Sequence, residues 1–71
     1  MYKVGDRVKI KNLRRGRNKY DVYITPDMED MSGQTQAITK VEPFGNFTVY
    51  KITNSYRWFT DEEFVRSAIM V

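Results

Sequence analysis

The chain has 71 residues, of which 30% are charged and 14% are aromatic, and it contains neither cysteine nor histidine. This length suits one small domain, residues 1–71, and leaves no room for a second core. Disulfides, thiolate metal sites and the commonest general base are missing, so we expect no enzyme, no metal and no cofactor. No apolar run approaches the roughly 18 residues of a membrane span, and no signal peptide is recognisable. We therefore expect a cytoplasmic protein without membrane contact or small-molecule substrate.

The net charge of +3 hides an uneven distribution along the chain. Residues 1–20 carry eight basic side chains and one acidic one, a balance of +7, whereas residues 21–71 carry four basic and eight acidic ones, a balance of −4. Such asymmetry favours an anionic partner for the basic half, although the two halves could also neutralise each other in the fold.

The first expected element is a strand over residues 4–11, where Val8 and Ile10 alternate with basic residues. This period of two is typical of a strand with one buried face. Residues 12–19 combine turn residues with four bases and show no apolar periodicity, so we expect a mobile loop. A short extended piece should follow at residues 20–24.

A single capped helical turn is expected between Thr25 and Gly33. Thr25 can serve as the N-cap, Pro26 suits the first helical position, and Gly33 can adopt the left-handed exit conformation. Met28 and Met31 are three residues apart and should face the same way. We interpret them as core residues, with a partner-binding groove as the alternative.

A three-strand meander is expected next. Residues 34–41 favour a strand with an irregularity, because their apolar positions change parity. Turn residues at 42–46 lead into a strand over 47–53, which predicts a hairpin. A tight turn at 54–55 then leads into a strand over 56–59.

The C-terminal part begins with a capping box, in which Thr60 and Glu63 are spaced to satisfy each other's amides. Phe64 and Val65 should enter the core from this turn, and residues 66–71 could add a last short strand. The acidic residues at 61–63, like those of the earlier helical turn, fit helix-start chemistry and lack the spacing of a calcium loop.

The expected core consists of apolar residues from these elements: Val8, Ile10, Ile38, Tyr50, Ile52 and Phe64. Trp58 and Phe59 should point to opposite faces if their segment is a strand. We expect Trp58 to pack against the turn at Phe64 and Phe59 to lie partly exposed beside Tyr56. The alternative is that both rings are buried.

Several stretches together carry a resemblance to known families: Gly5-Asp6-Arg7-Val8-Lys9-Ile10, Gly33, Tyr50-Lys51-Ile52 and Trp58-Phe59-Thr60-Asp61-Glu62-Glu63-Phe64. They resemble small SH3-like proteins common in phage and prophage genomes, and also the barrel module of Mib-Herc2 type. The first strand is similar to the KOW motif of ribosomal and transcription-elongation proteins, with a longer spacing to Gly33. The resemblance implies a mostly β fold, a small five-stranded SH3-like barrel with one or two single-turn helices, acting as a binding module.

The candidate contact residues are the cations of the basic loop from Lys11 to Lys19, the neighbouring tyrosines and two aromatic residues of the 56–59 segment: Lys11, Arg14, Arg15, Arg17, Lys19, Tyr20, Tyr23, Tyr56 and Phe59. Arginines bond phosphates in a forked geometry, and aromatic rings stack on unpaired bases. Our leading hypothesis is therefore contact with a nucleic-acid backbone.

Three alternatives remain open from the sequence. The loop could be a solvated one, or it could pair with the acidic residues at 27–30. The protein could instead be an interaction module, such as a phage factor that docks on a host protein and modulates it. A homodimer through edge strands is the third alternative, so we expect a monomer or a weak homodimer.

Overall fold

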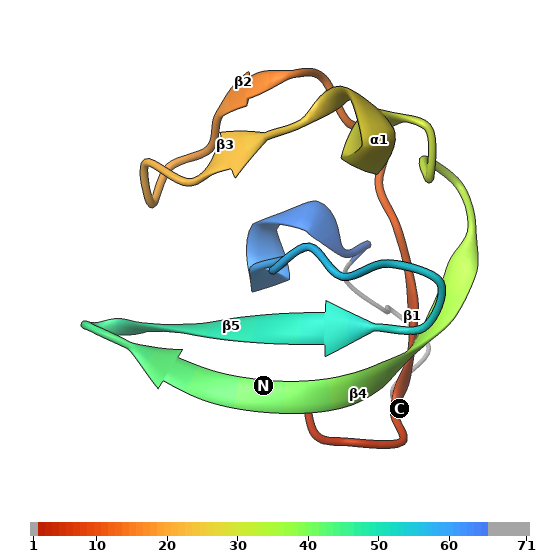
Figure 1. Ribbon diagram of the computed structural model, residues 1–71, viewed down its shortest axis with the longest axis vertical. Coiled ribbons are helices and arrows are strands. Elements are labelled where there is room, and N and C mark those ends of the chain that lie inside the picture. The colour runs from red at the N-terminus through yellow and green to blue at the C-terminus, as the bar shows by residue number, and fades with distance from the viewer. Residues whose placement is uncertain (1, 66–71) are drawn as a thin grey trace.

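The computed structural model describes residues 2–65. In chain order the elements are β1 (Arg7–Lys9), β2 (Gly16–Arg17), β3 (Tyr23–Ile24), α1 (Pro26–Glu29), β4 (Thr35–Phe44), β5 (Phe47–Ile52) and the 3-10 turn η1 (Asp61–Glu63). One antiparallel sheet has the order β1-β4-β5 and a second pairs β2 with β3. Figure 1 shows the long β4–β5 hairpin on one side and β2, β3 and α1 on the other, with η1 between them. The mostly β prediction is confirmed, but within residues 2–65 the two sheets are not closed into a barrel.

Strand β1 forms as its alternation predicts. Val8 is buried between exposed Arg7 and Lys9, and it pairs with buried Gln36 of β4. Ile10 continues the pairing as an isolated bridge to Phe64. One face of β1 therefore enters the core and the other carries only cations.

The β4–β5 hairpin is longer than predicted. The expected irregularity is confirmed as a register shift between Ile38 and Lys40. The expected turn at 42–46 is too long, because β4 continues to Phe44, which pairs with Phe47. Gly45 has a φ of +65° and begins the connection, and a glycine at the first turn position is the signature of a type II′ turn.

The expected third strand of the meander is absent from the described residues. Residues 56–59 pair with β5 only through a bridge between Tyr50 and Phe59, whose backbone hydrogen bonds are both 2.7 Å long. The last strand expected at 66–71 lies outside the described residues.

Both short helical turns occur where the sequence predicts them. Thr25 occupies the N-cap of α1, although its side chain makes no capping bond, and Gly33 has the expected positive φ of +83°. At η1 the capping box between Thr60 and Glu63 is confirmed in both directions. Phe64 is buried as expected, whereas the core placement of Val65 is wrong because it is exposed.

All six predicted core residues are buried, and both methionines join them. The residues of the core cluster are Val8, Ile10, Ile24, Met28, Met31, Ile38, Tyr50, Ile52, Phe59 and Phe64. The prediction for the aromatic pair is wrong: Phe59 is 0% exposed and Trp58 is 36% exposed. Residues directly opposite in an antiparallel pair share a face, and Phe59 lies opposite the inward-pointing Tyr50. Phe59 therefore plugs the core and Trp58 points outward.

We expect Phe59→Ala to lower the free energy of unfolding by about 3–5 kcal/mol, since it removes a fully buried ring and leaves a cavity. Trp58→Ala should cost much less because its ring is already partly in solvent. Urea unfolding of the two variants measures the difference. An equal loss, or a larger one for Trp58→Ala, would contradict the assignment of the two rings.

Candidate functional site

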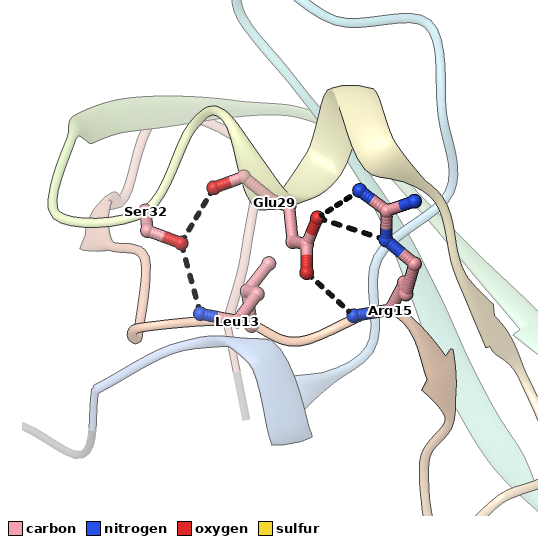
Figure 2. A network of polar contacts seen from close by, with 4 residues as sticks. All are labelled: Leu13, Arg15, Glu29 and Ser32. Atoms are coloured by element: carbon pink, nitrogen blue, oxygen red, sulfur yellow. Dashed lines mark hydrogen bonds and ion pairs between the residues drawn. The ribbon is translucent and has the colours of Figure 1, made fainter.

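The end of the basic segment after β1 forms part of a hairpin over residues 15–24, called the hairpin below. Gly16 pairs with Ile24 and Arg17 with Tyr23, so the loop expected at 12–19 is corrected at these two positions, whereas residues 12–14 have no regular structure. The segment is also tied to the residues that follow α1, as Figure 2 shows. The amide of Leu13 donates to Ser32 Oγ at 2.8 Å, and this hydroxyl donates to the carbonyl of Glu29 at 2.7 Å.

Three of the five candidate cations are engaged in ion pairs within the molecule. Arg15 binds Glu29 through both its backbone amide (2.9 Å) and its guanidinium (3.0 Å), as Figure 2 shows. The other two pairs join Arg17 to Asp21 at 3.3 Å and Lys19 to Glu62 at 3.2 Å. The alternative in which the loop pairs with the acidic residues at 27–30 is thus confirmed at Glu29.

The two remaining candidate cations, Lys11 and Arg14, are exposed and form no ion pair within residues 2–65. The same holds for Arg7 and Lys9 on the outer face of β1. The unpaired candidate cations therefore lie on the N-terminal side of the predicted site, next to the two exposed cations of β1.

Asn18 joins the hairpin to η1. Its side-chain Nδ2 donates to Thr60 Oγ1 at 3.0 Å and to Glu63 Oε2 at 2.8 Å. Its side-chain Oδ1 accepts from the backbone amides of Tyr20 and Val22. Glu63 is 1% exposed, and its other oxygen accepts from the amide and hydroxyl of Thr60 at 2.7 and 2.9 Å. A buried carboxylate is tolerated only when it is hydrogen-bonded, so this network locks the hairpin onto η1.

Tyr20 is half-buried and stacks on Phe47 with ring centroids 4.6 Å apart and an interplanar angle of 13°. The rings of Phe44 and Phe47 are in an edge-to-face arrangement with their centroids 5.5 Å apart. An open cleft of about 280 Å³ lies beside this stack, lined by Tyr20, Asn46, Phe47, Thr48, Tyr50 and Asp61. Desolvation and the neighbouring Asp61 raise the pKa of Tyr20, because both disfavour the phenolate.

The other three candidate aromatic residues differ in accessibility. Tyr23 is 50% exposed and Tyr56 is 81% exposed, so both are open to a partner. Phe59 is fully buried and cannot contact one, which corrects its assignment to the site.

Residues of the outer sheet face were missed by the sequence reasoning. Lys40 of β4 lies opposite Lys51 of β5, and Lys51 Nζ lies 4.8 Å from the centroid of the exposed Trp58 ring. The signal for the lysine pair is present in the sequence: with Gly45-Asn46 as a two-residue turn, counting back along both strands places residue 40 opposite residue 51.

We expect Asn18→Ala to lower the free energy of unfolding by about 2–3 kcal/mol, because the buried Glu63 carboxylate loses a donor. Asn12→Ala, at an exposed position of the same segment, is the matched control and should change stability little. Urea unfolding measures both. Equal, small effects of the two substitutions would show that the network does not hold the hairpin in place.

The Arg15–Glu29 pair predicts a pH dependence. The backbone amide and guanidinium of Arg15 lower the pKa of Glu29 below its ordinary value of 4.5. A carboxyl whose pKa is lower in the folded state stabilises the fold above its unfolded pKa and loses that contribution as the pH falls. Wild-type protein should therefore be more stable than Glu29→Gln near neutral pH, and the difference should shrink below pH 4.5.

Urea unfolding over a pH series measures that difference. Asp30→Asn removes an exposed carboxylate that has no ion pair in the described residues and serves as the control. A stability difference between wild type and Glu29→Gln that stays constant over the whole series would contradict the role of the Arg15 contacts.

No group of three or more acidic, histidine or cysteine side chains in residues 2–65 is arranged to hold a metal ion. Among these residues no helix is long and apolar enough to cross a membrane. Comparison with known proteins finds no family model, no curated protein and no solved structure that matches the chain.

Proposed function

We propose that this protein is a non-enzymatic binding module of the SH3-like phage type and that it contacts the phosphate backbone of nucleic acid. The proposed contact residues are the unpaired cations along β1 and just after it: Arg7, Lys9, Lys11 and Arg14. One observation carries the proposal. These four side chains are exposed and form no ion pair within residues 2–65, whereas the hairpin cations Arg15, Arg17 and Lys19 do.

The spacing of these cations supports contact with a regular row of anions. Arg7 and Lys9 alternate with the buried Val8 and Ile10, so they share the outer face of β1. Alternate residues of a strand are about 6.8 Å apart, which lets neighbouring side chains reach separate phosphates. Neutralising several phosphates releases counterions, so binding of this kind weakens steeply with salt and depends little on sequence.

The paired hairpin cations are less suited to the same role. To bind a phosphate, Arg15 would have to leave a carboxylate that its backbone amide and guanidinium both contact. Tyr20 is likewise occupied, because one face of its ring stacks on Phe47. The proposal therefore moves the main contacts from the hairpin to β1.

Docking on a host protein is the second candidate, and it is favoured by the aromatic cleft. Phe44, which packs on the cleft residue Phe47, is 63% exposed. Asp61 of the cleft has an exposed carboxylate without an ion pair in the described residues. An exposed aromatic residue beside a cleft is typical of an anchor point for a protein partner.

Fluorescence anisotropy at about 50 and 200 mM salt tests the first candidate, with labelled single-stranded and duplex oligonucleotides. The β1 variant replaces Arg7, Lys9 and Lys11 by glutamine, and the hairpin variant does the same to Arg15, Arg17 and Lys19. Both lose three charges, so they are matched controls for each other. Each lost phosphate contact lowers the salt slope by about 1, so the slope should fall by about 3 in the β1 variant.

The hairpin variant should keep most of the affinity. If the hairpin variant lost binding and the β1 variant kept it, the contacts would lie on the hairpin and not on β1, which contradicts the proposal. Absence of binding by the wild-type protein even at the lower salt would contradict nucleic-acid contact and favour the protein partner.

A further inference from the structure

The outer face of the β4–β5 hairpin carries a row of three side chains, Lys40, Lys51 and Trp58. Lys40 and Lys51 are direct cross-strand partners. Tyr50 pairs with Phe59, and in an antiparallel pair the flanking residues face each other, so Lys51 lies opposite Trp58. The Lys51 ammonium is 4.8 Å from the centroid of the indole ring.

The contact between Lys51 and Trp58 stabilises part of this row, but the facing lysines do not. Like charges directly opposite each other in a sheet are destabilising. Among the described residues, Lys40 has only Glu42, at 4.0 Å, to offset the repulsion, and Lys51 forms no ion pair. Trp58 gains less from burial than a core ring because it is 36% exposed.

The row is also held in a defined position. Arg57, next to Trp58, binds Asp27 of α1 with Nε and Oδ2 2.9 Å apart, and the guanidinium lowers the pKa of Asp27 to about 2. On the other side of Trp58, Phe59 is fixed by its bridge to Tyr50. The indole is therefore presented by a segment that is anchored at both neighbours.

We propose that this row binds one nucleotide of a single-stranded nucleic acid, with the phosphate between the ammonium groups of Lys40 and Lys51 and the base stacked on Trp58. This inference rests on the proposed function and specifies the form of nucleic acid that is preferred. Neighbouring strands are about 4.8 Å apart, so two facing lysines reach a single phosphate. The flexible stem of Lys51 allows its ammonium to move from the ring to the phosphate and so free the ring face.

The row and the β1 cations share one face of the β1-β4-β5 sheet, on either side of the register shift between Ile38 and Lys40. The buried pairs Val8–Gln36 and Ile38–Ile52 define the inner face of the β1-β4-β5 sheet, and the cations of β1 and of the row lie on the opposite face. A single-stranded nucleic acid bound along β1 can therefore extend across this sheet face to Trp58. The other aromatic cluster is a poorer stacking site, because Tyr20 and Phe47 already cover each other.

The preference for single-stranded over duplex nucleic acid follows from base stacking. In a duplex the bases stack on one another, whereas an unpaired base is free to stack on an aromatic side chain. Contact with Trp58 should therefore add affinity for a single strand and none for a duplex.

Three labelled ligands separate these contributions: a thymidine oligonucleotide of about 16 nucleotides, an abasic strand with the same number of phosphates, and a duplex of that length. Trp58→Leu keeps an apolar side chain but removes the ring, and Trp58→Phe keeps a ring. We expect Trp58→Leu to bind the thymidine strand about tenfold more weakly and the other two ligands as wild type does. Trp58→Phe should retain most of the affinity.

The protein has one tryptophan, so its intrinsic fluorescence reports on the same contact. The thymidine strand should quench Trp58 fluorescence and the abasic strand should not. A wild-type protein that binds nucleic acid but whose Trp58→Leu variant binds the thymidine strand equally well would overturn the inference and leave the proposed function standing. An equal loss for thymidine and abasic strands would also overturn it, and no binding by wild type would overturn both proposals.

Discussion

The hydrogen bonds accepted by the buried side chain of Glu63 are the interaction on which the rest of the structure depends. It forms no ion pair in the described residues, and its oxygens accept hydrogen bonds from Thr60 and Asn18. Removing such a group from water is unfavourable unless its hydrogen bonds are made, so this network couples η1 to the hairpin. Because η1 lies between Phe59 and Phe64, the same network also sets the positions of two rings of the core.

This arrangement divides the basic residues into two groups. The hairpin lies over η1 and α1, both rich in carboxylates, so its cations Arg15 and Lys19 are used to hold the fold together. On β1 and on the outer face of β4 and β5, Arg7, Lys9 and Lys51 form no ion pair in the described residues, and Lys40 reaches Glu42 at 4.0 Å. The charge asymmetry of the sequence is thus partly neutralised within the fold and partly left on one sheet face, where we propose that a polyanion binds.

Local patterns in the sequence predicted much of this structure. Alternation located the core side of β1, parity located the irregularity at Ile38, and the capping box located η1, since each depends on residues close together in the chain. The Asn18–Glu63 bond joins residues 45 positions apart, and no local pattern reveals it. The direction of the Trp58 side chain was predicted wrongly because it depends on which β5 residue lies opposite Trp58. That register is set by tertiary structure and not by the local sequence.

The most direct test of a nucleic-acid surface on the outer sheet face is an NMR titration of ¹⁵N-labelled protein with a thymidine oligonucleotide. Shifts at the amides of Arg7, Lys9 and Lys51 and at the indole N–H of Trp58, with the amides around Tyr20 and Phe47 unchanged, are the predicted result. Shifts confined to the cleft beside Tyr20 and Phe47, or no shifts at all, would contradict the account.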